Sequence, residues 1–280
     1  MRLRFPTGLS VYQAILAANG CGLDRLDAQL LVLHVLGKSP HDRAWLLAHD
    51  TDPMDADALQ RLDTLVQRRQ SGEPLAYLTG HKEFFGLDLL VDARVLDPRA
   101  DTETLVEWAL EVLRDVPSAN AIDLGTGSGA VALALKATRP DLQMTAVDFS
   151  EDALAVAQQN AQRLALTVSF QQGSWLTGVH GRFNAIVSNP PYIAAHDEHL
   201  AALIHEPLQA LASGRDGLDD IRKIIQQAPA RLLPGGWLLL EHGYDQALAV
   251  RELLVEAGLL EVQSRQDLSG IERCSGGRVP

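Results

Sequence analysis

The chain has little cysteine, no long apolar run and no excess of positive charge, and each absence excludes a class of protein. Two cysteines among 280 residues, Cys21 and Cys274, cannot form a disulfide framework and suit a reducing compartment. No apolar stretch is long enough to cross a bilayer. The first residues lack the apolar core of a signal peptide. We therefore expect a cytoplasmic protein with no membrane partner.

The charge balance argues against a nucleic-acid partner. The chain has 24 Lys and Arg residues against 36 Asp and Glu residues, which gives a net charge of −12. This is the wrong sign for a protein that follows a phosphate backbone. The hydrophobic content of 46% and the charged content of 21% are ordinary for a globular protein. A chain of this length can form one large domain or two smaller ones, each with its own core.

The pattern up to about Gln70 is helical, without strand alternation. The expected helices are Val11–Ala18 after a Ser10 cap, a nearly all-apolar helix capped by Asp27, Asp42–Ala48 and Asp55–Gln70. Arginines at 61, 68 and 69 are interpreted as a solvated helix face, with a binding patch as the alternative. The turn-rich stretch 71–74 then marks a boundary. Two short runs, Leu75–Leu78 and Leu87–Val91, predict the strands of a hairpin. We therefore expect a helical N-terminal domain over residues 1–72, a hairpin connector over 73–93 and a larger domain over 94–280.

From Asn120 onward strands and helices alternate, which predicts an α/β domain with a mostly parallel sheet and helices on both faces. The expected strands are Ala121–Leu124, Gln143–Val147, Val168–Gln171, Ala185–Ser188, Trp237–Leu240, Leu260–Arg265 and a short one near Cys274–Val279. The expected helices are Ala130–Thr138, Asp152–Leu164, Asp219–Leu232 and Gln246–Ala257. In such sheets, ligands bind beyond the carboxyl ends of the strands.

A glycine-rich turn joins the first of these strands to its helix. Glycines there let the backbone approach a ligand closely, with a helix N-terminus behind the turn. The spacing also fits the dinucleotide fingerprint in its Gly-x-Gly-x-x-Ala form. The predicted cofactor-binding residues are Gly125, Thr126, Gly127, Ser128 and Gly129.

Two further residues are candidates for holding a nucleoside. Asp148 ends the second strand, about 20 residues beyond the glycines, where a carboxylate can accept both ribose hydroxyls. Its alternative role is to cap the following helix, although Ser150 can also do so. Trp175 follows the third strand and can supply a flat apolar face for adenine. A core tryptophan is an equally good interpretation of that residue.

The fourth strand ends in Asn189-Pro190-Pro191-Tyr192. Neither proline can donate to a sheet ladder, and each fixes its own φ, so the segment is a stiff extended loop. The loop presents one amide side chain, backbone carbonyls and one aromatic ring. A nicotinamide enzyme would need a proton-transfer group here. An amide and carbonyls instead suit a planar –NH2 group, whose two hydrogens they can accept. The loop thus indicates methylation of a planar nitrogen by S-adenosylmethionine.

These motifs resemble those of a known family. Asp-Leu-Gly-Thr-Gly-Ser-Gly at 123–129, Ala-Val-Asp at 146–148 and Asn-Pro-Pro-Tyr at 189–192 resemble class I S-adenosylmethionine-dependent methyltransferases that act on planar nitrogens. Further segments are similar to the release-factor glutamine methyltransferases of the HemK/PrmC type, and the similarity covers nearly the whole chain. These segments are 72–80, 83–87, 99–103, 206–211 and 240–243.

The resemblance implies a Rossmann-like domain with a mostly parallel seven-stranded sheet. It implies methyl transfer from S-adenosylmethionine, with S-adenosylhomocysteine as the product, to the N5 amide nitrogen of the glutamine in the Gly-Gly-Gln loop of peptide chain release factors. The Asn189 side-chain oxygen and the Pro190 carbonyl would accept the two amide hydrogens, and Tyr192 would pack against the glutamine. Asn189 would also contact the cofactor, and Pro191 the substrate. The N-terminal bundle and the hairpin would hold the protein substrate.

Three positions depart from the family pattern. Asp97 and Ala100 replace the usual residues of the segment before Asp101-Thr102-Glu103, and Ser174 stands where the family often has aspartate. The alternatives to this function are a ribosomal-protein glutamine methyltransferase, a nucleic-acid adenine-N6 methyltransferase, a dehydrogenase and a cofactor-binding module without catalysis. No metal site is expected, because the His196–His199 segment does not have the zinc spacing and suits a polar helix start.

Overall fold

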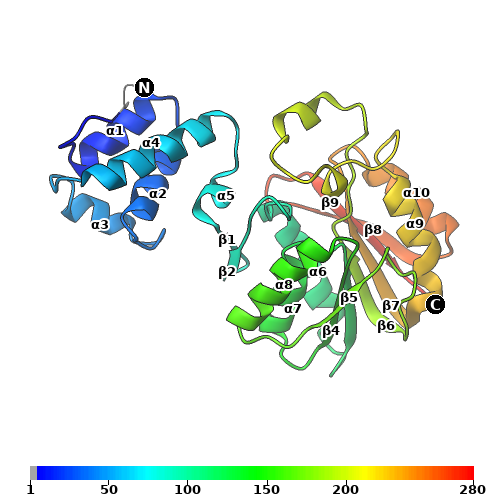
Figure 1. Cartoon of the computed structure of the whole chain (residues 1–280). Coiled ribbons are helices and arrows are strands. Elements are labelled where there is room, and N and C mark those ends of the chain that lie inside the picture. The colour runs from blue at the N-terminus through cyan, green and yellow to red at the C-terminus, as the bar shows by residue number, and fades with distance from the viewer. Residues whose placement is uncertain (1–4) are drawn as a thin grey trace. The chain divides into compact units, whose positions relative to one another are not determined.

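The computed structural model describes residues 5–280, and the chain divides into two compact units (Figure 1). The N-terminal unit ends at Gly80, and the C-terminal unit is His81–Pro280. The stretch expected to form a connector, residues 73–93, is thus divided between the two units. Within residues 5–280, no helix combines the length and the apolar content needed to span a membrane.

The N-terminal unit is helical, as predicted. Its helices are α1 (Val11–Gly20), α2 (Arg25–Val35), α3 (Arg43–Ala48), α4 (Ala56–Gln70) and α5 (Leu75–Thr79). Ser10 caps α1 in a reciprocal capping box with Gln13, and Asp55 caps α4 through the Ala58 N–H. The prediction that Asp27 caps the second helix was wrong. The cap is Asp24, whose side chain accepts from the Asp27 N–H, so the helix begins earlier than its apolar residues suggest.

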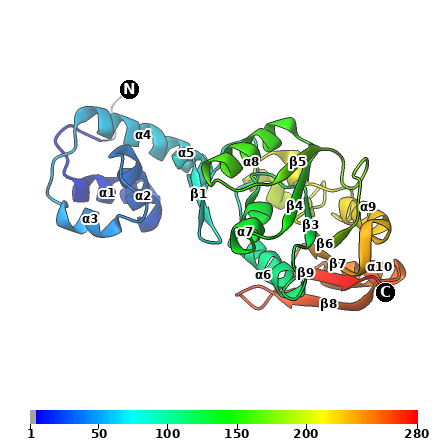
Figure 2. The same cartoon turned by 90° about the horizontal axis from the view of Figure 1, so that it is seen from below.

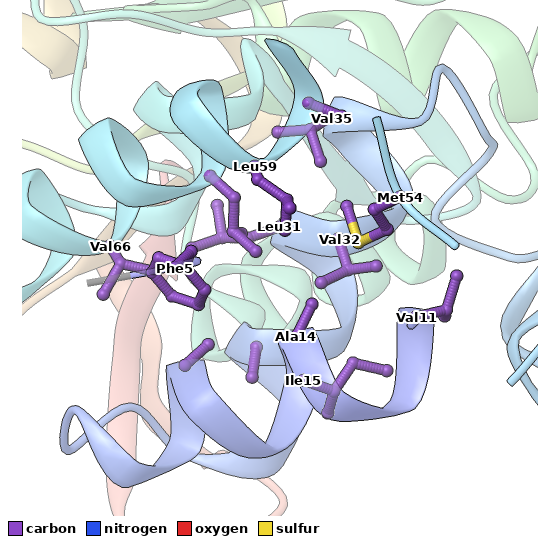
Figure 3. Close-up of a cluster of buried hydrophobic side chains, with 14 of the residues drawn as sticks. Phe5, Val11, Ala14, Ile15, Leu31, Val32, Val35, Met54, Leu59 and Val66 are labelled. Atoms are coloured by element: carbon purple, nitrogen blue, oxygen red, sulfur yellow. The ribbon is translucent and has the colours of Figure 1, made fainter. Parts of the chain in front are cut away.

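The core of this unit is centred on α2 (Figure 3). Leu31, Val32 and Leu33 of α2 are fully buried, which agrees with the nearly all-apolar pattern of this helix. Each such side chain contributes about 1.5–3 kcal/mol through its removal from water. Neither sequence interpretation of the α4 arginines describes Arg69, whose guanidinium binds the Asp27 carboxylate at 2.6 Å. Arg61 likewise donates to the carbonyl of Val35. These arginines fasten α4 to α2.

The prediction of a strand at Leu75–Leu78 was wrong, because this segment is the helix α5. A four-residue apolar run does not distinguish a strand from a buried helical turn. The hairpin lies later, in strands β1 (His81–Phe84) and β2 (Leu87–Leu90), which pair antiparallel. Phe85 and Gly86 form its two-residue turn with φ values of 49° and 78°. Two positive values in succession are typical of a turn that matches the twist of paired strands.

The C-terminal unit has a seven-stranded sheet in the order β5-β4-β3-β6-β7-β9-β8. Strands β3 to β7 run parallel, and β9 pairs antiparallel with both β7 and β8. This confirms the predicted α/β fold class. The strands are β3 (Asn120–Leu124), β4 (Gln143–Asp148), β5 (Ser169–Gln172), β6 (Phe183–Ser188), β7 (Leu232–Glu241), β8 (Leu260–Gln266) and β9 (Glu272–Arg278).

Helices cover both faces of this sheet (Figure 2). The α-helices are α6 (Glu103–Val112), α7 (Ala130–Thr138), α8 (Glu151–Arg163), α9 (Asp219–Gln227) and α10 (Ala247–Glu256). Figure 2 shows α6, α7 and α8 on one face and α9 and α10 on the other. The 3-10 helices are η1 (Ala100–Thr102), η2 (Glu198–Ala202), η3 (Leu208–Ala210) and η4 (Ala228–Arg231). The predicted extension of α9 to Leu232 was wrong. Pro229 disfavours α-helix in the residue before it, and the chain continues as η4.

The strand order explains where a ligand can bind. Strand β3 has β4 on one side and β6 on the other, so the order of the chain reverses between β3 and β6. At such a switch point the loops after the two strands diverge to opposite faces and leave a crevice. The loops that diverge here are the glycine-rich turn after Leu124 and the Asn-Pro-Pro-Tyr segment after Ser188. The fold thus brings together the two motifs that the sequence singles out.

Candidate active site

A cavity of about 270 Å³ lies at the carboxyl ends of the parallel strands. It collects residues from the turn after β3, the end of β4, the loop after β5 and the loop after β6. The lining includes Gly125, Gly127, Asp148, Trp175, Asn189 and Pro191, which are all predicted site residues. It also includes residues that were not among the predicted site residues: Arg94, Val95, Leu96, Phe149, Ser150, Ala153, Gly173, Ser174, Pro207, Gln209, Ala210, Asp220 and Lys223.

The glycine-rich turn has the backbone conformation that its composition predicts. Gly125, Gly127 and Gly129 have φ values of 70°, 56° and 85°, a region that side chains disfavour. A Cβ on Gly125 would lie 3.3 Å from the Trp175 ring, and one on Gly129 would lie 2.9 Å from a Leu133 methyl group. The first glycine therefore admits the indole to the cavity, and the last lets the turn pack on α7.

Other residues of this turn support it from beneath. Thr126 is buried and donates its hydroxyl hydrogen to Asp123 at 2.6 Å, and the Ser128 carbonyl accepts from Asn160. Thr126, Ser128 and Gly129 do not line the cavity. Burial raises the pKa of Asp123 to about 7, although hydrogen bonds from Thr126 and from the Ala132 N–H act to lower it. The sequence prediction placed all five turn residues at the cofactor, because a motif does not distinguish a lining residue from a supporting one.

Asp148 faces the cavity and also organises the turns around it. Its Oδ2 accepts the Gly127 N–H at 2.8 Å, and its Oδ1 accepts the Ser150 N–H at 2.9 Å. Burial raises the pKa of Asp148, and these two backbone donors oppose the rise. Ser150 itself caps α8 through the Ala153 N–H. Asp148 is therefore not the helix cap, and its carboxylate stands at the cavity wall as an acceptor for a ligand hydroxyl.

Trp175 is half-buried, and its ring forms part of the cavity wall. Its φ of 53° lies in the left-handed region, which a bulky residue rarely adopts. The indole Nε1 donates to Asp220 Oδ1 at 3.2 Å, and Ser213 donates to Asp220 Oδ2 at 2.7 Å. These contacts hold the ring beside Gly125. Trp175 thus lines the cavity and also packs against the core of this unit.

Asn189 lies between two cavities. A second cavity of about 90 Å³ shares Leu96, Asn189 and Ala210 with the first, and it also contacts Arg99, Tyr192, Ile193, Leu203 and Leu211. The Asn189 Nδ2 donates to the Thr102 hydroxyl oxygen at 3.1 Å. Because one end of the amide is engaged behind the site, its Oδ1 is the end available to a ligand. The first cavity, at about 270 Å³, is the larger of the two, and the second has about 90 Å³.

The remaining residues of the loop take different positions. Pro190 is buried, and its side chain lines neither cavity. Pro191 lines the larger cavity, and Tyr192 lines the smaller one. The Tyr192 hydroxyl donates to Glu241 Oε1 at 3.4 Å, and burial together with the Glu241 charge raises the pKa of Tyr192. The ring is therefore a neutral apolar wall with its polar end anchored.

Comparison with known proteins decides the family. Residues 9–80 match the family model described as the PrmC N-terminal domain, and residues 101–217 match the methyltransferase small domain. The chain is 51% identical to a release factor glutamine methyltransferase of Bordetella pertussis over 91% of this chain and 95% of that protein. It is 48% identical to one of Xylella fastidiosa over 95% of this chain and 98% of that protein. The chain belongs to the release factor glutamine methyltransferase family.

The fold agrees with that assignment. A methyltransferase from Pyrococcus furiosus superposes with a TM-score of 0.53 at 21% identity, over 76% of this chain and 95% of that one. A likeness at this identity supports the fold. The chain is therefore an enzyme, a class I methyltransferase, and its methyl donor is S-adenosylmethionine. The larger cavity suits this donor because it combines an aromatic wall, a carboxylate and a glycine turn that admits close approach.

An ion-pair cluster that the sequence did not indicate lies beside the smaller cavity of this methyltransferase, which Arg99 lines. Arg99 binds the buried carboxylate of Glu206 at 2.5 Å, and the other oxygen of Glu206 accepts the Asp97 N–H. The Asp97 carboxylate, at a position where the family pattern differs, is within 3.3 Å of Lys82 and 3.5 Å of Arg99. The carboxylate that this departure introduces is thus paired with two cations. The cluster ties the segment before η1 to the segment that carries η2 and η3.

The His196–His199 segment contains the start of a helix, as predicted. Asp197 precedes the 3-10 helix η2, and its side chain accepts from the His199 N–H. The His199 ring lies 2.6 Å from the same carboxylate. These contacts are local and give the segment a capping role.

Proposed function

We propose that this enzyme methylates the N5 amide nitrogen of the glutamine in the Gly-Gly-Gln loop of peptide chain release factors. The observation that carries the proposal is the position of Asn189, between a nucleoside-sized cavity and a narrower one, with its Oδ1 available to a ligand. The names of the relatives support the substrate class. Release factors act at the ribosome, so we also propose a cytoplasmic location.

The cofactor would be held by contacts that the geometry makes available. The Asp148 carboxylate would accept the ribose hydroxyls, and the Trp175 ring would lie against the adenine. Gly125 and Gly127 would let the amino-acid portion of the donor approach the backbone. Ser174, where the family often has aspartate, lines the cavity and would contribute a hydroxyl. With these roles the sulfonium methyl would face Asn189, which the two cavities share.

The acceptor nitrogen would be held by Asn189 Oδ1 and the Pro190 carbonyl. A glutamine amide nitrogen is a poor nucleophile, because its lone pair is delocalised into the carbonyl. As the nitrogen attacks, it becomes tetrahedral and its hydrogens become more acidic, so the two acceptors bind it more strongly in the transition state. The N–C bond would form as the C–S bond breaks, S-adenosylhomocysteine would be released, and the proton would be lost to water. Tyr192 would pack against the glutamine side chain, with Pro191 beside it.

The N-terminal unit and the β1–β2 hairpin would bind the body of the release factor. The net charge of −12 disfavours the alternative of a nucleic-acid adenine, because a phosphate backbone would be repelled. A ribosomal-protein glutamine remains the alternative that shares the same active-site chemistry. No direct nucleic-acid contact is needed for the proposed reaction.

The test is methyl transfer from labelled S-adenosylmethionine to purified release factor, ribosomal protein, total RNA and DNA in parallel. We expect label in the release factor alone, and mass spectrometry should locate one methyl group on the glutamine of its Gly-Gly-Gln peptide. A release factor whose loop glutamine is replaced by alanine is the matched control. Label in RNA or DNA, or in the ribosomal protein with none in the release factor, would overturn the proposal.

A further inference from the structure

The two ends of an asparagine side chain have the same shape and opposite chemistry. One end accepts hydrogen bonds and the other donates them, so a 180° turn of the Asn189 amide would present donors to the substrate's own –NH2 group. Only the orientation with Oδ1 forward can hold the acceptor nitrogen. Something behind Asn189 must therefore select the orientation, and the contact on that side is the Thr102 hydroxyl, 3.1 Å from Nδ2.

Thr102 stands at the start of α6, in a position where threonine normally caps the helix. A capping threonine accepts a hydrogen bond from an N–H of the first helical turn. Thr102 makes no such bond, because it is also the last residue of η1 and its own backbone is already helical, with φ −66° and ψ −18°; the residue is 4% exposed. Its oxygen is used by Asn189 instead. The buried hydroxyl therefore has no capping role and is used by the active-site amide.

A hydroxyl alone does not select the amide orientation, because it can either accept from Nδ2 or donate to Oδ1. Glu241, at the end of β7, is fully buried, and the Thr102 hydroxyl is close enough to lower the pKa of its carboxyl. An ionised carboxylate can only accept, so it takes the Thr102 hydrogen and leaves the hydroxyl oxygen to accept from Asn189. Oε1 accepts from the Tyr192 hydroxyl. No residue in the described range 5–280 makes a well-aligned hydrogen bond to Oε2, so the carboxylate has acceptor capacity to spare.

We propose that Thr102 and Glu241 form a buried relay that turns the Asn189 amide so that its oxygen faces the substrate nitrogen. This inference rests on the proposed function of Asn189. The donor direction runs from Asn189 to Thr102 and from Thr102 to Glu241. Tyr192 donates to the same carboxylate. The two polar side chains of the Asn-Pro-Pro-Tyr loop are therefore both connected to one buried anion, Tyr192 directly and Asn189 through Thr102. Thr102 and Glu241 are positioning residues, since neither lines either cavity.

The relay predicts a pH dependence. Burial raises the pKa of Glu241 to about 7; the hydrogen bond from Thr102 and the charge of Arg273 oppose the rise, and the charge of Asp101 adds to it. Tyr192 donates to the same carboxyl, and Cys274 is its cross-strand neighbour on β9. A protonated Glu241 can donate to Thr102, which can then donate to Asn189 Oδ1 and favour the turned amide. Turnover should therefore fall as pH decreases through about 7, without a matching loss of cofactor affinity.

The experiment compares Thr102→Val with Thr102→Ser in the full-length enzyme, using release factor as substrate. Valine keeps the shape and removes the hydroxyl, so kcat should fall about tenfold or more, the effect of one lost hydrogen bond of ordinary strength. Serine restores the hydroxyl and should keep kcat near wild type. KM for the donor and calorimetric binding of S-adenosylhomocysteine should be unchanged in both variants. Thr138→Val, which removes the hydrogen bond from an exposed threonine to the Ala134 carbonyl of α7, is the matched control.

Glu241→Gln supplies the second readout. A glutamine can donate to Thr102 at every pH, so this variant should be slow throughout and should lose the decline of kcat around pH 7. Wild-type kcat in Thr102→Val would overturn the relay while leaving the proposed function intact. If Thr102→Val does not fold, a wild-type kcat that is flat between pH 6 and 8, about one unit on either side of the Glu241 pKa of about 7, overturns it instead. A wild-type enzyme that does not methylate release factor would refute the proposed function itself.

Discussion

Replacing Gly125 with alanine should weaken donor binding through a single contact, and the structure offers a matched control. Gly125 has a φ of 70°, and an added Cβ would lie 3.3 Å from Cζ3 of Trp175 and 3.6 Å from Cη2. The ring must then move by a few tenths of an ångström, and it is held by Asp220 through Nε1. Because the indole is a wall of the cavity, its shift changes the space where the donor binds.

The magnitude can be separated into two parts. Alanine in a left-handed conformation costs about 1–2 kcal/mol of folding free energy whatever surrounds it. Gly178 has nearly the same φ, 74°, and an added Cβ there would meet nothing within 4 Å. Gly178→Ala should therefore lower stability by a similar amount and leave donor binding unchanged. Gly125→Ala should in addition raise the Kd for S-adenosylhomocysteine about tenfold, which corresponds to about 1.4 kcal/mol.

The assay is isothermal titration calorimetry with S-adenosylhomocysteine, together with thermal unfolding of wild type and both variants. The difference between the two variants isolates the contact with Trp175 from the backbone strain that they share. Equal Kd values in Gly125→Ala and Gly178→Ala would refute the reasoning. Such a result would mean that the indole wall adjusts without cost, or that the donor does not use it.

The other predictions concern the acceptor, the ribose site, the ion-pair cluster and the pH dependence of stability. Asn189→Ala should abolish turnover and leave calorimetric binding of S-adenosylhomocysteine mostly intact; near-wild-type rates would contradict its role. Asp148→Asn should weaken that binding about tenfold or more, since charged acceptors make the stronger hydrogen bonds, and unchanged affinity would exclude a ribose contact. Arg99→Met should lower the free energy of unfolding by about 3 kcal/mol, because it leaves the buried Glu206 carboxylate without its cation. Denaturant titration measures this change. Adding Glu206→Gln to the variant should recover part of the lost stability. Glu241 has a folded pKa raised from 4.5 to about 7, so the folded state binds more protons than the unfolded state between these values. Its contribution to stability should fall as pH rises from 4.5 to 7, and Glu241→Gln should make the measured stability less dependent on pH in that window.

The sequence alone determined the fold class and the motifs that meet at the switch point. Alternating strands and helices predicted the parallel sheet, and every strand and helix expected after Asn120 is present, with differences mainly at the ends. The glycine turn and the Asn-Pro-Pro-Tyr loop were predictable because each encodes a local backbone conformation. Positive φ requires glycine, and proline stops a ladder, wherever the segment lies in the fold.

Short segments without a strong local preference were predicted less well. The apolar run at Leu75–Leu78 suited a strand and a helical turn equally, and only packing against α2 and α4 decided for the helix. Asp24 displaced Asp27 as the cap of α2, because the helix begins before its apolar stripe. Asp27 instead forms an ion pair with Arg69, 42 residues away in the chain. Such pairings depend on which helix faces meet, which periodicity alone does not specify.

Only the tertiary structure determined which residues hold the site residues in position. Asn189 is 87 residues from Thr102, and Tyr192 is 49 residues from Glu241, so no spacing in the sequence relates them. Asp220 reaches Trp175 across 45 residues, and Glu206 reaches Arg99 across 107. The residues that touch a ligand are confined to strand ends by local chemistry, and a motif can reveal them. The residues that orient them are those that the fold brings next to the site, at the ends of other strands and the starts of other helices. These contacts exist only in the folded chain.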